Sequence, residues 1–217
     1  PFDGDQIDLF IETWYRELVR RHRLAAPKAE KQAGQLQRAV RRGDLRGLAG
    51  RPLLLTAMTL LHTFRGQLPQ DRTELYASTV DLLLRRWEGR VGVEEGVLEQ
   101  LDVPGLKMSD LEAGLYAVAF YAHSEAGQDD GASTADIDEG DLRKWLAPYL
   151  GDSWDKAGDF VAYIRERAGL LIRHKPQAYT FPHRTFQEFM AACHLVGLAD
   201  YPRQAARLVR DDPARWP

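Results

Sequence analysis

Residues 179–192, which read YTFPHRTFQEFMAA, decide the fold. They predict a short strand, a histidine at the turn and an amphipathic helix. Residues 170–174 form a second apolar run, and residues 175–178 have the composition of a tight turn, so the two runs predict a hairpin. Apolar residues in the helix recur at three- and four-residue spacing, which predicts one buried face: Phe186, Phe189, Met190, Cys193 and Val196. Helix, hairpin and helix in this order outline a winged-helix module.

His183 stands at the predicted start of that last helix. The unpaired backbone N–H groups and the dipole of a helix start favour an anion. A neutral imidazole can donate a hydrogen bond to a phosphate oxygen, and a charged one adds attraction. A polar residue here is also what an ordinary helix cap requires. The residues alone leave both roles of His183 open.

Most of the remaining chain has helical periodicity. Pro52 suits the first position of a helix over 53–64, where its missing N–H costs nothing. That helix is apolar on nearly every side, so we expect it to be buried in a bundle. Ser109 and Glu112 match a capping box, and Gly169 suits a left-handed helix end. We expect further helices over residues 7–19, 28–42, 71–87, 109–122, 138–150 and 154–168, and a short one from residue 202.

The composition of the chain divides it into domains. Residues 89–105 are rich in glycine and acidic residues and read as a connection. We therefore predict a mainly α fold in which a helical bundle is followed by a winged-helix domain with one small β-hairpin. The predicted boundaries are a helical domain over 1–90, a linker over 91–107, a winged-helix domain over 108–200 and the start of a following helical segment over 201–217.

The overall composition excludes several classes of protein. With 217 residues, 44% of them hydrophobic, the chain can build real cores. A net charge of −3 argues against a general nucleic-acid binder. Local basic clusters over 20–23 and 41–42 read as solvated helix faces. The single cysteine, Cys193, excludes a disulfide framework and fits a reducing compartment. No apolar stretch approaches the roughly 20 residues that span a bilayer, so we expect no membrane partner and a cytoplasmic location.

Catalytic and metal-binding constellations are not recognisable. Gln187 and Glu188 have no second carboxylate or nucleophile at a recognisable spacing, so we expect them to stabilise the helix start. The spacing of His174, His183 and the pair 193–194 fits no common zinc pattern. The tryptophans fall on helical stripes, which favours core packing: Trp14, Trp87, Trp145 and Trp154.

Three segments resemble one known family. The pattern F-x-H-x-x-F-Q-E-F-x-A-A over 181–192 resembles the winged-helix signature of NACHT-type signal-transduction NTPases. Residues 48–56 and 66–76 are similar to the first helical domain of that family, and residues 7–15 resemble the segment that leaves its nucleotide-binding core. The resemblance implies that Pro52 touches the adenine ring and that His183 contacts the β-phosphate of bound ADP, holding a closed, inactive state.

The family resemblance also implies what lies outside these residues. The sequence contains no Gly-Lys-Ser or Gly-Lys-Thr and no βαβ series, so we expect this chain not to hydrolyse nucleotide itself. It is expected to be the regulatory half of an ATPase of the STAND class. ADP or ATP, with magnesium, would be held mainly by an N-terminal half of the same protein. Arg51 departs from the smaller polar residue that is common in the family.

The sequence therefore leaves two alternative functions. The first is a nucleotide-state sensor that controls homo-oligomerisation, in defence or stress signalling by resemblance. The second is a winged-helix DNA-binding transcriptional regulator, which docks as a variant of the helix-turn-helix. For DNA binding, the wing offers a modest basic patch over 173–175, while the helix over 155–168 balances acidic and basic residues.

Overall fold

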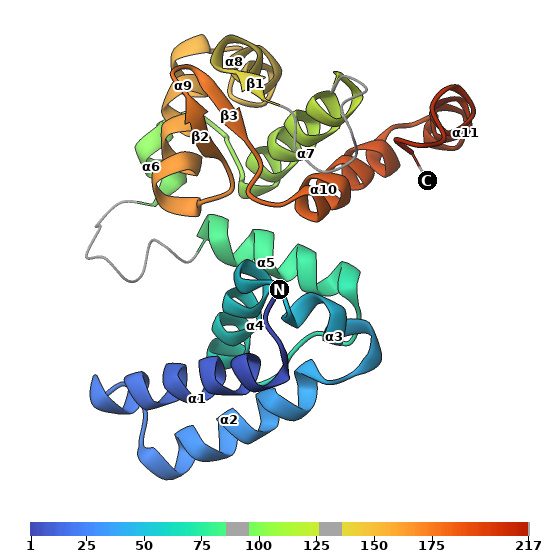
Figure 1. Ribbon diagram of the computed structural model, residues 1–217. Coiled ribbons are helices and arrows are strands. Elements are labelled where there is room, and N and C mark those ends of the chain that lie inside the picture. Colours follow the sequence, from blue (N-terminus) through green and yellow to red (C-terminus); the bar gives the residue numbers. More distant parts are fainter. Residues whose placement is uncertain (86–95, 126–135, 217) are drawn as a thin grey trace. The chain divides into compact units, whose positions relative to one another are not determined.

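The computed structural model describes residues 1–85, 96–125 and 136–216 (Figure 1). It confirms a mainly helical fold with a small antiparallel sheet. The chain forms two compact units, Pro1–Leu82 and Leu83–Pro217, and each is described by itself. No helix in the described ranges is long and apolar enough to cross a membrane.

The first unit is a helical bundle. Its helices are α1 (Gly4–Arg20), α2 (Ala26–Val40), α3 (Gly43–Ala49), α4 (Pro52–Arg65) and the larger part of α5 (Arg72–Arg85). Helices α1 and α2 pack on each other, and α4 contacts α1, α2 and α3. The core is built from completely or almost completely buried apolar side chains, among them Ile11, Leu36, Leu54, Leu55, Met58 and Leu61. The predicted burial of α4 is confirmed over most of its length, although Leu53 and Phe64 at its two ends are exposed.

A buried polar contact joins α1 to α4. The Tyr15 hydroxyl lies 2.7 Å from Nδ1 of His62, and both side chains are almost completely buried. The indole N–H of Trp14 donates to Oγ1 of Thr63 at 3.1 Å. Burial lowers the pKa of His62, because the charged imidazolium loses its hydration. The bundle therefore holds a neutral histidine in its core.

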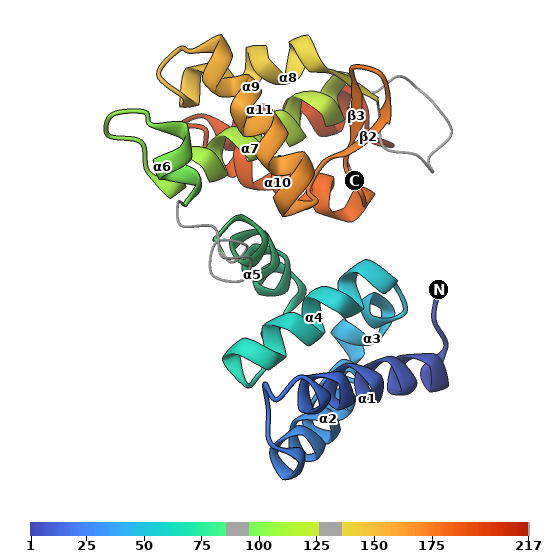
Figure 2. The same ribbon diagram turned by 90° about the vertical axis from the view of Figure 1, so that its left-hand side faces the viewer.

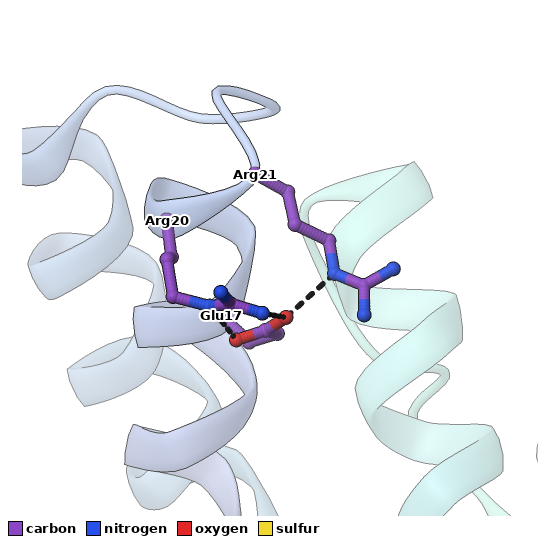
Figure 3. Close-up of polar contacts among 3 residues, drawn as sticks. All are labelled: Glu17, Arg20 and Arg21. Carbon is purple, nitrogen blue, oxygen red and sulfur yellow. Dashed lines mark hydrogen bonds and ion pairs between the residues drawn. The ribbon is translucent and has the colours of Figure 1, made fainter.

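The basic cluster at the end of α1 faces solvent, as predicted. Arg20 and Arg21 both converge on the carboxylate of Glu17, at 2.7 and 2.6 Å (Figure 3). The hydrogen bonds from these guanidinium groups lower the pKa of Glu17 from 4.5 to about 2. All three side chains remain well exposed, so this cluster is a solvated helix end that one carboxylate partly neutralises.

The second unit is built around α7 (Met108–Glu125). Helix α7 packs along α10 (Arg184–Gly197) and against α8 (Glu139–Leu146), and both views place it between them (Figure 1 and Figure 2). Helix α8 in turn packs on α9 (Trp154–Tyr163), which also contacts α6 (Val97–Leu101). A 3-10 turn, Ala147–Tyr149, follows α8, and a π-helical turn, Ile164–Ala168, extends α9. Helix α11 (Tyr201–Asp211) ends the helical order.

The sheet has the predicted hairpin and one additional strand. Strands β2 (Ile172–Lys175) and β3 (Ala178–Thr180) form the hairpin, and Gln177 takes a left-handed conformation in its turn, with φ 63°. Strand β1 (Ile137–Asp138) was not predicted; it pairs antiparallel with β3, opposite Tyr179 and Ala178. The strand order is β1-β3-β2, so the wing is a three-stranded sheet with β3 in its centre.

The segment after α11 folds back onto α7. The ring of Trp216 meets the ring of His123 edge to face, with 4.6 Å between centroids, and lies 5.6 Å from that of Phe120. His123 Nε2 lies 3.0 Å from the carbonyl oxygen of Arg215, whose guanidinium donates to the carbonyl of Ser124 at 2.5 Å. Burial is the main influence on His123 and lowers its pKa.

Some local expectations were wrong. Helices α3 and α6 were not predicted, and α6 lies in the segment expected to be a connection. Helix α7 begins one residue earlier than its predicted cap Ser109: the carboxylate of Asp110 accepts the backbone N–H of Lys107 at 2.8 Å. Gly169 does end its helix in a left-handed conformation, with φ 63°, as expected. Trp87 and the first residues of the predicted linker lie outside the described residues.

The buried face of α10 also differs from the prediction. Val196 is 63% exposed and Cys193 is only half-buried. The side chains that do face the core are Phe186, Gln187, Met190, Ala191 and Leu195. Trp154 was expected in the core but is 51% exposed, because it is the first residue of α9 and stands at the edge of the unit.

Candidate functional site

His183 is the N-cap residue of α10, shortly after the wing. Phe181, which follows β3, is buried, and this anchor fixes where the chain leaves the sheet. His183 has an extended backbone, with φ −154° and ψ 127°, as N-cap residues usually have. Its carbonyl oxygen accepts the backbone N–H groups of Phe186 at 3.0 Å and Gln187 at 3.3 Å. The predicted position of His183 at the helix start is therefore confirmed.

The imidazole of His183 caps the helix with one particular nitrogen. Nδ1 accepts the backbone N–H of Thr185 at 3.2 Å and lies 2.8 Å from the hydroxyl oxygen of Thr185. A neutral imidazole has one acceptor and one donor nitrogen. Because Nδ1 accepts the backbone N–H, the neutral ring carries its hydrogen on Nε2. The capping role of His183 leaves the ring in the tautomer that donates through Nε2.

The first turn of α10 contains an internal ion pair. Nε of Arg184 donates to Oε1 of Glu188 at 2.8 Å, four residues along the helix. This contact compensates part of the cationic charge of Arg184. We expected Gln187 to stabilise the helix start, but its side chain is almost completely buried in the unit. His183 thus remains the side chain of this turn that combines a helix-start position with a donor nitrogen.

A network of polar side chains holds the wing against α8. The Tyr179 hydroxyl donates to Oε2 of Glu139 at 2.9 Å, and the guanidinium of Arg143 donates to Oε1 of Glu139 at 2.5 Å. Hydrogen bonding to Arg143 lowers the pKa of Glu139, and burial raises the pKa of Tyr179. This network could not be predicted from the sequence, because Tyr179 lies far from its partner along the chain. Only the four-residue spacing of Glu139 and Arg143 was visible as a signal.

Pro52 lies in the first unit, whereas His183 lies in the second. Pro52 is the first residue of α4 and is exposed, so its predicted role as a helix starter is confirmed. Just before it, the carbonyl of Gly50 accepts the backbone N–H of Phe2 at 2.6 Å. A Cβ atom on Gly50 would stand 3.2 Å from the carbonyl oxygen of Phe2. The N-terminal residues therefore pack closely beside the start of α4.

The first unit also contains an open cleft of about 630 Å³ at the turn between α4 and α5. Its charged lining consists of Arg42, Arg65, Asp71 and Glu74. These groups already have partners: Arg42 donates to the carbonyl of Pro69 at 3.0 Å, and Arg65 donates to the hydroxyl of Ser78 at 2.7 Å. Pro52, the predicted site residue of this unit, does not line the cleft.

Cys193 is half-buried on α10, next to His194. Burial raises the pKa of the Cys193 thiol and lowers the pKa of His194. A thiol with a raised pKa is a poor nucleophile near neutral pH. Within the described ranges, no three histidine, cysteine, aspartate or glutamate side chains gather as metal ligands.

The comparison with protein families gives one match. The model of the winged helix-turn-helix domain C-terminal to NACHT matches residues 72–195, which is more than half of the chain. The chain belongs to this family. The matched range runs from α5 through the wing and includes His183 and most of α10. The comparisons with curated proteins and with solved structures found no match. The predicted relation to NACHT proteins and the winged-helix fold are thereby confirmed.

Proposed function

We propose that this winged-helix chain senses the phosphate state of a nucleotide held by a NACHT domain of the same protein. His183 would donate a hydrogen bond from Nε2 to the β-phosphate of ADP. Pro52 would offer its apolar ring edge to the adenine. Magnesium and the remaining phosphate contacts would be supplied mainly by the nucleotide-binding half, and this chain would not hydrolyse the nucleotide.

The position of His183 carries the proposal. Helix starts attract anions through unpaired N–H groups and the helix dipole, and α10 is long enough to provide that dipole. The bond from Thr185 to Nδ1 sets the tautomer whose other nitrogen donates. The capping role and the sensing role of His183 therefore use different atoms of one ring and can exist together.

The switch follows from the difference between the two nucleotides. A ligand shifts a conformational equilibrium only by its differential affinity for the two states. ADP would favour the closed state through His183. Exchange for ATP would weaken that contact, release the winged helix and expose surfaces for homo-oligomerisation. Defence or stress signalling is the setting in which such a switch would act.

The test separates sensing from capping by means of two substitutions in the full-length protein. His183→Ala removes both the cap and the donor, whereas His183→Asn keeps a good capping residue, whose amide nitrogen takes the place of the ring's Cδ2 and does not reach as far as Nε2. We expect both variants to lose ADP retention, by at least about tenfold for a lost hydrogen bond to a charged group. We expect only His183→Ala to lose stability, by about 1 kcal/mol.

His22→Asn is the matched control for this experiment. His22 is exposed and has a positive φ of 53°, a conformation that asparagine tolerates well. It should change neither ADP retention nor stability. If His183→Asn retains ADP as the unchanged protein does, His183 is a helix cap only, and the sensing role is excluded.

The alternative of DNA binding receives less support from the charges of the second unit. In a helix-turn-helix arrangement, α9 would be the helix placed toward DNA. Its exposed face carries Asp155 and Asp159, which would repel phosphate groups. On the wing, Lys175 is paired with Asp136 at 2.9 Å. A salt-dependent shift of duplex DNA by this chain at low ionic strength would restore the alternative.

A further inference from the structure

Helix α11 presents a basic stripe to solvent. Arg203, Arg207 and Arg210 are exposed and recur at four- and three-residue spacing, which places them on one face at about 100° per residue. Arg210 contacts its neighbour Asp211 at 3.4 Å. In the part of the chain that the structure describes, the side chains of Arg203 and Arg207 make no hydrogen bond or ion pair. The stripe therefore holds cationic charge that its own unit does not compensate.

Helix α9 presents the opposite charge. Asp155 and Asp159 are exposed and project from the side of the helix that faces away from the buried residues Ala157, Phe160 and Val161, and Glu166 is exposed in the π-helical turn that extends α9. Glu166 is paired with Arg165. Asp155 and Asp159 have no side-chain partner among the described residues. Their four-residue spacing equals that of Arg203 and Arg207, so the two pairs of charges lie equally far apart along their helices.

The two stripes lie on opposite sides of the second unit. Figure 1 shows α9 at one side of this unit and α11 at the other, with α7 and α10 between them. One chain therefore cannot pair its own stripes. Two copies can pair them, because the basic stripe of one copy and the acidic stripe of another are both accessible.

We propose that α11 of one copy packs against α9 of a second copy, with the Arg203 and Arg207 pair opposite the Asp155 and Asp159 pair. The contact is head-to-tail, because different surfaces of the two copies meet, so it can continue to further copies. This inference rests on the proposed function in one respect only: the pairing would be the contact that joins copies in the proposed oligomer. The pairing itself requires no nucleotide and is tested without any.

The test uses charge reversal in the 217-residue chain. We expect the unchanged chain to self-associate weakly at low salt, detectable by sedimentation velocity at concentrations up to about 1 mM. The variants Arg203→Glu with Arg207→Glu, and Asp155→Arg with Asp159→Arg, should each lower the association constant at least about tenfold, because like charges then face each other. Raising NaCl from about 0.1 M to about 1 M, which shortens the Debye length from roughly 10 Å to 3 Å, should weaken association similarly.

Mixing the two variants gives the decisive result. The reversed α11 of the first variant is acidic and matches the reversed, basic α9 of the second, and their unchanged stripes also match. An equimolar mixture should therefore associate as the unchanged chain does, although neither variant does so alone. The control Arg23→Glu with Lys31→Glu makes the same change in net charge as the α11 variant, at exposed residues of the first unit, and should associate normally.

Three results would overturn the pairing: an unchanged chain that stays monomeric at low salt, reversal variants that associate normally, or a mixture that fails to associate. None of these results depends on His183. If the pairing is absent but the His183 variants lose ADP, the proposed function stands and the pairing is excluded. If the pairing is present but His183→Asn retains ADP, the pairing stands and the proposed function is excluded.

Discussion

Gly158 offers a sharp test of how the second unit is packed. A Cβ atom at this position of α9 would stand 2.6 Å from Nη1 and 2.7 Å from Cζ of Arg143. The guanidinium of Arg143 also binds Glu139 and lies 5.9 Å from the ring centroid of Trp154. Gly158→Ala must therefore displace the end of a flexible side chain, and that side chain must give up its contacts.

Two opposing effects decide the stability of Gly158→Ala. Alanine in a helix interior is about 0.8–1.0 kcal/mol more favourable than glycine. Against this, a partly exposed ion pair contributes about 0.2–1 kcal/mol. A cation–π contact of an accessible side chain contributes about 0.5–1 kcal/mol. Gly158→Ala should thus be close to neutral or destabilise by up to about 1 kcal/mol.

Removing Arg143 tests whether its displacement causes the destabilising effect of Gly158→Ala. In an Arg143→Ala background, the steric conflict is absent and Gly158→Ala should stabilise the protein by about 0.8–1.0 kcal/mol. Urea unfolding of the four proteins of this double-mutant cycle, followed by tryptophan fluorescence, measures the coupling, which we expect at about 1–2 kcal/mol. A coupling below about 0.5 kcal/mol would refute the reasoning, because Gly158→Ala would then act independently of Arg143.

The remaining predictions concern the titrating groups and the first unit. Burial lowers the pKa of His62 and His123, so the unfolded chain binds more protons than the folded one below about pH 6.5. Stability present above that pH should therefore be lost as the pH falls, and unfolding by urea at a series of pH values measures the loss. Tyr15→Phe removes the partner of buried His62 Nδ1 and should cost about 1–3 kcal/mol, whereas the same change at exposed Tyr201 should stay within about 0.5 kcal/mol. The side-chain carboxyl of Glu17 should titrate near its pKa of about 2 in an NMR experiment, and a midpoint near 4.5 would contradict its contacts with the two arginines.

Strong local signals in the sequence were sufficient for much of the fold. The proline at the start of α4, the left-handed Gly169 and the hairpin before α10 each depend on the conformational preferences of a few neighbouring residues. The same is true of His183, because capping is decided within one turn of helix. These features could be read correctly because no distant part of the chain determines them.

Features that depend on distant residues could not be read in this way. Strand β1 has only two residues and exists because β3 lies beside it, about forty positions later in the chain. The apolar periodicity of α10 placed Val196 inside, but packing against α7 leaves it exposed and buries Gln187 instead. Trp154 was misplaced for a related reason: hydrophobic character alone does not tell which end of a helix reaches the edge of its unit. The contact of Pro52 with a base stays a prediction.

The short strand β1 has a mechanical consequence for the wing. It leads directly into α8, and the backbone N–H of Glu139 donates to the carbonyl of Gln177 at the hairpin turn, at 2.9 Å. The Tyr179–Glu139 and Lys175–Asp136 contacts add two further ties between the same elements. These three contacts hold the wing to β1 and the start of α8. A force applied to the hairpin would be transmitted to α8. The wing and α8 would therefore move together as one rigid body, and the wing would not bend away from α8.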